Sequence, residues 1–113
     1  MPAFPKLVDS PVAVGVVEQS IVGPFSTRGE DIILIVIENS SATETLDAYV
    51  RTSPTGTSKW YREPDDAFGA MAPLTTRRYL LPPDRLWAQV LGQYQVAPAT
   101  ARVSLYVLTA SWL

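Results

Sequence analysis

The run of six apolar residues from Ile32 to Ile37 constrains the fold more than any other stretch of the sequence. It is too short for the roughly 20-residue helix that crosses a membrane, and its isoleucines and valine carry branched side chains that favour a strand. A strand with one face in solvent would alternate apolar and polar residues, and this one does not. One row of a central strand would enter a core, and the other would need a cover from another segment or a neighbouring chain. The two candidate rows are Ile32, Leu34 and Val36, and Ile33, Ile35 and Ile37.

Short runs rich in branched and aromatic residues make up most of the remaining chain, and ten prolines and six glycines interrupt helical patterns between them. Several runs alternate, as in 45–53, where Leu46, Ala48 and Val50 face one way. Seven or eight antiparallel strands separated by turn signals are typical of a β-sandwich or a small barrel. We predict an all-β, single-domain β-sandwich, either jelly-roll-like or immunoglobulin-like. Its strands are expected near 12–18, 31–38, 45–53, 58–63, 75–81, 85–92 and 101–109, with room for a shorter one at 21–27.

The chain of 113 residues fits one domain. Pro2, Pro5 and Pro11 favour polyproline or edge conformations near the N-terminus, so we expect an extended arm at 1–11 and the sandwich at 12–113. The segment DDAFGAMAPL, residues 65–74, fits either a single helical turn or a loop that crosses between the sheets.

Composition argues against several classes of function. Cysteine and histidine are absent, which removes disulfides, thiolate and imidazole metal ligands, and the usual general base near neutral pH. Nine basic and eleven acidic residues are scattered along the chain, so no basic stripe is available to neutralise phosphates. The N-terminal residues lack the apolar region of a secretion signal. We expect a soluble, non-secreted protein that uses no cofactor and binds neither nucleic acid nor a membrane.

The carboxylates of Glu63, Asp65 and Asp66 come nearest to a catalytic or metal site. Clustered carboxylates can transfer protons or hold Ca²⁺, but the spacing of a calcium-binding loop is missing. A solvated turn with neighbouring arginines is the interpretation we favour. No glycine-rich phosphate loop is present, and without histidine no Ser-His-Asp arrangement can form, so we do not expect an enzyme.

Four aromatic residues raise a second hypothesis. Trp60, Tyr61, Trp87 and Tyr94 could form a stacking platform for sugar rings. Large aromatic side chains also dominate the packing of cores and contacts, and we favour that role for them.

Both ends of the chain carry apolar residues that a free tail gains little by exposing. Phe4, Leu7 and Val8 lie near the N-terminus, and Trp112 and Leu113 end the chain. Such ends can dock on their own sheet, but together with a strand that is apolar on both faces they indicate surfaces completed by another chain. We take these five residues as candidate partner contacts.

Four segments occur in an order that resembles small β-sandwich modules of tailed-bacteriophage virion proteins: GPFSTRGEDIILIVIENSS, LDAYVRTSPTGTSKWYRE, RYLLPPDRLWAQVLGQ and ATARVSLYVL. In such modules a leading Gly-Pro-Phe-(Ser/Thr) segment precedes an apolar strand, and a hairpin and two further strands follow. The resemblance covers residues 20–109 and leaves out the N-terminal arm. It implies a structural, non-enzymatic role on a virus particle, and it carries over no site residues.

Modules of this size often serve as capsid decoration (cement) proteins or as small head or tail components. The resemblance therefore implies a partner in the major capsid protein or another virion protein, with assembly in the host cytoplasm and residence on the virion. A carbohydrate-binding host-attachment module and a small tail accessory protein are the alternatives. An exposed apolar face is also compatible with a homo-oligomer, a trimer included.

Overall fold

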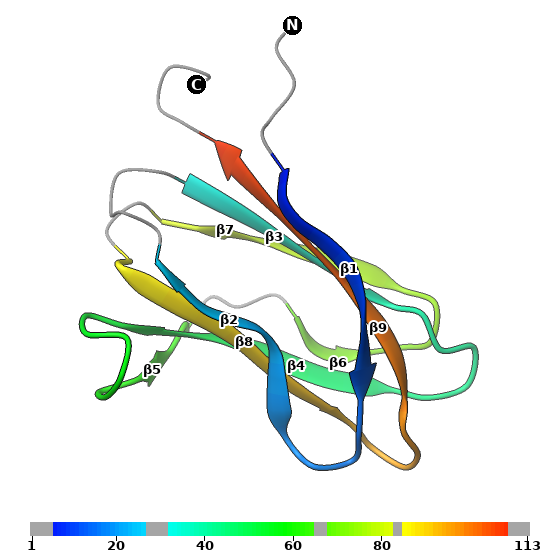
Figure 1. Cartoon of the computed structure of the whole chain (residues 1–113). Coiled ribbons are helices and arrows are strands. Elements are labelled where there is room, and N and C mark those ends of the chain that lie inside the picture. Colours follow the sequence, from blue (N-terminus) through cyan, green and yellow to red (C-terminus); the bar gives the residue numbers. More distant parts are fainter. Residues whose placement is uncertain (1–5, 27–31, 65–67, 83–84, 109–113) are drawn as a thin grey trace, which may run out of the picture.

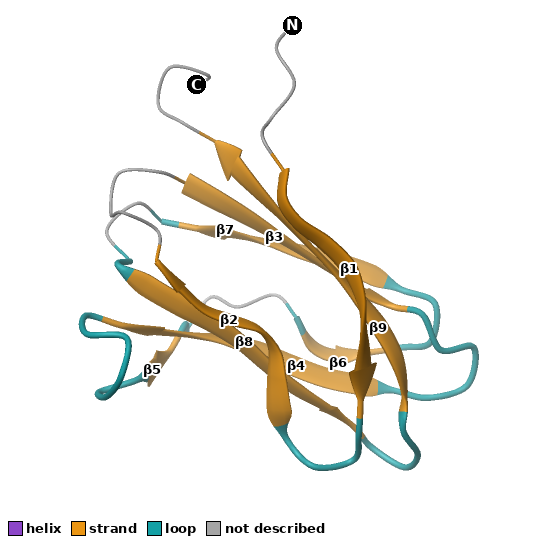
Figure 2. Ribbon diagram, viewed as in Figure 1, coloured by secondary structure: helices purple, strands orange, loops and turns teal. Residues whose placement is uncertain are grey.

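The computed structural model describes residues 6–26, 32–64, 68–82 and 85–108. These residues form nine strands in two antiparallel sheets that pack face to face (Figure 1), and they contain no helix (Figure 2). It follows that no helix of the described residues could span a membrane. The predicted all-β sandwich is confirmed.

The first sheet has the strand order β1-β9-β3-β7. Its strands are β1 (Lys6–Val14), β9 (Ala99–Leu108), β3 (Ile32–Asn39) and β7 (Thr76–Leu81). The apolar run lies in β3, which pairs along its whole length with β9 on one side and with β7 on the other. This strand is therefore central, as the sequence predicts.

The second sheet has the order β2-β8-β4-β5, and β6 also pairs with β4. Its longer strands are β2 (Gln19–Ser26), β8 (Trp87–Tyr94) and β4 (Leu46–Ser53). Two short strands, β5 (Tyr61–Arg62) and β6 (Gly69–Met71), pair with opposite ends of β4. The edge of β4 that faces away from β8 is thus covered in two separate pieces.

Three predicted segments differ in detail from the observed strands. Residues 6–11 of the predicted arm form the first part of β1, where Pro11 is tolerated because β1 is an edge strand. The strand predicted at 58–63 is reduced to β5. The described part of 65–74 contains β6 and no helical turn, and it continues from the second sheet to β7 of the first.

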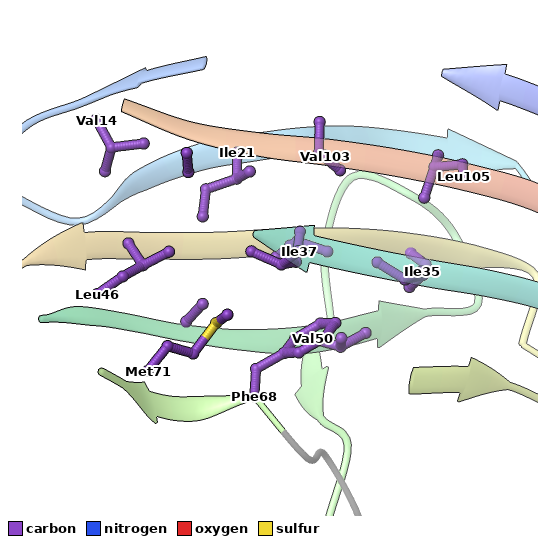
Figure 3. Close-up of a cluster of buried hydrophobic side chains, with 14 of the residues drawn as sticks. Val14, Ile21, Ile35, Ile37, Leu46, Val50, Phe68, Met71, Val103 and Leu105 are labelled. Atoms are coloured by element: carbon purple, nitrogen blue, oxygen red, sulfur yellow. The ribbon is translucent and has the colours of Figure 1, made fainter. Parts of the chain in front are cut away.

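The hydrophobic core lies between the two sheets. Ile33, Ile35 and Ile37 of β3 point into it and are at most 2% exposed, so the second of the two candidate rows faces inward. The same core cluster contains Val50 of β4 and Val90 of β8, both fully buried. Figure 3 shows Ile35 and Ile37 in this cluster with Val50. The other core residues are Val14, Ile21, Leu46, Ala48, Phe68, Met71, Leu81, Ala88, Tyr94, Ala101, Val103 and Leu105.

The two faces of β3 should respond differently to truncation. Ile35→Ala empties a fully buried site, and we expect it to lower the free energy of unfolding by about 2–5 kcal/mol. Leu34→Ala removes as many carbon atoms from the half-exposed outer row, and we expect a loss of about 1 kcal/mol or less. Urea denaturation of the two variants measures the difference, and equal losses would contradict the assignment of the faces.

Candidate functional site

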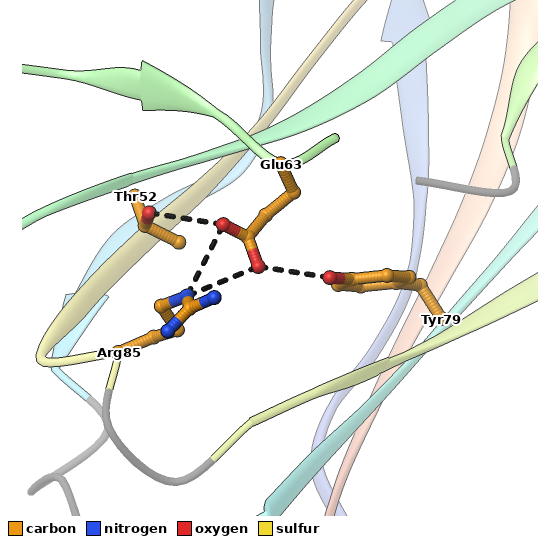
Figure 4. A network of polar contacts seen from close by, with 4 residues as sticks. All are labelled: Thr52, Glu63, Tyr79 and Arg85. Carbon is orange, nitrogen blue, oxygen red and sulfur yellow. Dashed lines mark hydrogen bonds and ion pairs between the residues drawn. The ribbon is translucent and has the colours of Figure 1, made fainter. Parts of the chain in front are cut away.

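The carboxylate of Glu63 is buried in a polar network between the two sheets (Figure 4). Arg85 Nε lies 3.2 Å from each carboxylate oxygen, and the Tyr79 hydroxyl donates a hydrogen bond of 2.8 Å. The hydroxyl of Thr52 donates a longer one of 3.3 Å. Because Thr52 belongs to β4 and Tyr79 to β7, the network links the second sheet to the first.

This burial corrects the interpretation of Glu63 as part of a solvated turn. The residue is 4% exposed, and its ionic partner is Arg85 and not one of the arginines nearer in sequence. Both oxygens of the Glu63 carboxylate already have hydrogen-bond partners within the chain, so we assign the carboxylate a structural role. Asp65 and Asp66 lie outside the described residues, and the described residues hold no cluster of three acidic side chains that could bind a metal ion.

Tyr94 lies in the core and has no exposed surface. Its hydroxyl is 2.8 Å from Asn39 Oδ1 and 2.7 Å from the carbonyl oxygen of Thr100. The Asn39 amide donates in turn to the carbonyl oxygens of Glu44 and Met71, at 2.7 and 3.1 Å. Burial raises the pKa of Tyr94 above its ordinary value, so the residue stays neutral. The hydrogen bond of its hydroxyl with Asn39 connects β8 to the end of β3.

The two tryptophans of the predicted sugar platform are engaged by neighbouring groups. The Arg51 guanidinium lies 4.7 Å from the centre of the Trp60 ring and also donates two hydrogen bonds to Gln89. The Trp87 ring packs against Gly56, where an added Cβ would lie 2.6 Å from a ring atom. Gly56 has a φ of 80°, so a side chain at this position is unfavourable on both counts.

Tyr61 is the one platform residue of the four with a largely exposed ring, at 62%. It lines a small hollow of about 150 Å³ together with Thr52 and Leu86. Tyr61 precedes Arg62 in β5. Because adjacent residues of a strand point to opposite faces, the Tyr61 side chain lies on the opposite face of β5 from Arg62. With Tyr94 in the core, the four aromatic residues do not share one surface.

The outer face of the first sheet carries an apolar patch that no described strand covers. Leu34 of β3 stands opposite Leu80 of β7 and opposite Tyr106 of β9, so the three side chains form a row across three strands. Leu80 is 55% exposed, and the other two are half-buried. We define the outer apolar patch as Ile32, Leu34, Val36, Leu80 and Tyr106.

A shallow hollow of about 480 Å³ lies within this patch. It is lined by Leu34, Tyr79 and Leu80, and by Arg78, which stands opposite Val36. The sequence pattern left open which row of β3 faces outward, and it did not single out Leu80 or Tyr106 as members of an apolar patch. The alternation in the segment TRRYLL, which places Arg78 and Leu80 on one face, is the signal that could have found Leu80.

Both ends of the described chain leave the first sheet beside the outer apolar patch. Lys6 at the start of β1 pairs with Tyr106, and Leu108 at the end of β9 pairs with Ile32. Figure 1 shows the start of β1 and the end of β9 at the same end of the sandwich. The topology therefore brings together the start of β1 and the end of β9, which are the two ends of the described chain.

The predicted partner contacts themselves are only partly described. Leu7 and Val8 lie in β1. Phe4, Trp112 and Leu113 lie outside the described residues.

Comparison of the chain with family models, characterised proteins and solved structures gave no match.

The network around Glu63 should make a measurable contribution to stability. Glu63→Gln keeps the shape of the side chain but removes the anion that Arg85 contacts, and we expect a loss of about 1–3 kcal/mol in the free energy of unfolding. Tyr79→Phe removes one hydrogen bond and should cost about 1 kcal/mol. Urea denaturation measures both, and a Glu63→Gln variant as stable as the unmodified protein would show that the network is not structural.

Proposed function

We propose that this chain is a non-enzymatic virion structural protein that binds a partner protein through the outer apolar patch. The observation that carries the proposal is the position of the patch. It lies on the solvent face of the first sheet, where none of the described strands covers it, at the end where both ends of the described chain emerge. A partner seated there would contact the patch beside the start of β1 and the end of β9.

The chemistry of the patch suits a protein interface. Interfaces have an apolar centre and a polar rim, and arginine is common among their contact residues. Leu34 and Leu80 form the apolar centre here, and Arg78 stands beside them at the rim of the hollow. Burial of apolar surface is worth about 25 cal/mol per Å², so covering an exposed leucine favours association.

The most concrete form of the proposal is a phage capsid decoration protein that binds the major capsid protein. The segment order over residues 20–109, which resembles small sandwich modules of phage virion proteins, supports this version. On a symmetric particle many copies bind at once, so a modest contact made by each copy becomes collectively strong. Such a protein would be made in the host cytoplasm and would reside on the virion, with a homo-oligomer, a trimer included, as one arrangement there.

The two alternatives differ in support. A small tail accessory protein would use the same patch with another virion partner. A host-attachment module built on Trp60, Tyr61, Trp87 and Tyr94 has less support, because these residues do not share a surface and Tyr94 is buried.

A sedimentation assay with expanded, undecorated capsids of the phage that encodes the chain tests the proposal. We expect the unmodified protein to sediment with the capsids, and Leu80→Asp to reduce its affinity about tenfold or more, because the charge enters the centre of the interface. Leu86→Asp is the matched control, since Leu86 is also an exposed leucine, at 45%, but lies outside the patch.

Failure of the unmodified protein to sediment with the capsids would rule out the decoration role. Equal binding by Leu80→Asp and the unmodified protein would rule out the patch as the contact surface. Circular dichroism of both variants checks that the sandwich is intact.

A further inference from the structure

A third hollow, of about 330 Å³, lies on the outer face of the second sheet, on the opposite side of the sandwich from the outer apolar patch. Its walls carry polar side chains from four parts of the fold. They are Glu18 in the turn between β1 and β2, Asp47 and Tyr49 of β4, Arg62 of β5 and Gln93 of β8. The volume falls at the lower end of the roughly 300–1,000 Å³ that is typical of small-molecule sites.

The hollow exists because the edge of β4 is covered in two pieces. β5 ends at Arg62, and β6 begins at Gly69, so the two short strands flank the middle of β4 without meeting. The residues that line the rest of the hollow are small, which leaves the space open. They are Ala48, Gly69, Ala70 and Gly92.

The polar side chains of the walls are held in place by contacts with one another and with Gln95. The Arg62 guanidinium lies 4.6 Å from the centre of the Tyr49 ring. Burial and a hydrogen bond with Glu18 raise the pKa of Tyr49, so its hydroxyl stays protonated. The Asp47 carboxylate accepts hydrogen bonds of 3.1 and 3.2 Å from Gln95. Groups fixed in this way lose less conformational freedom when a ligand binds.

The mixture of polar groups defines the chemistry of the occupant. Glu18 and Asp47 present hydrogen-bond acceptors, whereas Arg62 and Gln93 present donors. An anion would meet the two carboxylates, and a cation would meet the guanidinium. A hydroxyl group donates and accepts at once, so a neutral molecule with several hydroxyls satisfies both kinds of wall.

We propose that this hollow binds a neutral carbohydrate, such as a short stretch of a glycan chain. The proposal involves none of the four aromatic residues predicted as a sugar platform, and it stands whether or not the outer apolar patch binds a capsid. If that patch does face a particle, the hollow faces the surroundings, because the two surfaces lie on opposite sides of the sandwich.

The test is a titration of the isotope-labelled full chain, followed by NMR, with glucose, galactose, mannose, rhamnose and N-acetylglucosamine and their short oligosaccharides. We expect at least one of these probes, at millimolar concentration, to shift the backbone amide signals of Tyr49 and Gln93. Arg62→Gln should weaken that binding about tenfold, because a charged donor is lost from the wall.

Arg78→Gln is the matched control. Arg78 lines the hollow of the outer apolar patch on the first sheet, on the opposite side of the sandwich from the proposed carbohydrate site. It should leave saccharide binding unchanged. The proposal is overturned if no saccharide shifts the Tyr49 and Gln93 signals, or if Arg62→Gln and Arg78→Gln bind equally well. It is also overturned if only a charged analogue, glucose 6-phosphate or glucosamine, produces the shifts. Sedimentation of Arg62→Gln with capsids separates this result from the decoration role, which the substitution should not affect.

Discussion

The packing of Ile33, Ile35 and Ile37 against the second sheet is the interaction on which the rest of the structure depends. β3 is hydrogen-bonded on both edges, to β9 and to β7, and its inward row fills the centre of the core. Because side chains alternate along a strand, committing this row to the core places Leu34 and its neighbours on the solvent face. The outer apolar patch is therefore a direct consequence of a strand that is apolar on both sides. Large exposed apolar patches are common at protein interfaces, and the proposed partner contact rests on this feature.

Two buried polar networks link the two sheets. The Glu63 carboxylate joins β4 and β7 through Thr52 and Tyr79. The hydroxyl of Tyr94 joins β8 to the end of β3 through Asn39. The core and these networks hold the two sheets together, and each sheet has one outer face. One carries an apolar surface and the other a polar hollow, so the sandwich has two faces of different chemistry.

Local alternation was sufficient to predict most of the strands and the inward row of β4, in which Leu46, Ala48 and Val50 are buried as expected. It placed the start of one strand at residue 85, whereas β8 begins only at Trp87. Contacts between residues far apart in sequence were not predictable from local pattern. The partner of Glu63 is Arg85, 22 positions away, so the carboxylate looked like part of an exposed turn. The polar hollow was missed for the same reason, since it joins residues of β4, β5, β8 and the β1–β2 turn.

The most direct test of the claim that the outer apolar patch is a binding surface is hydroxyl-radical footprinting of the free protein and of the protein on capsids. The account predicts that Leu80 and Tyr106 become protected on the particle. Tyr61, exposed and outside the patch, should remain labelled to the same extent in both states. Equal labelling of Leu80 and Tyr106 in the free and bound states, or protection of Tyr61 in their place, would contradict it.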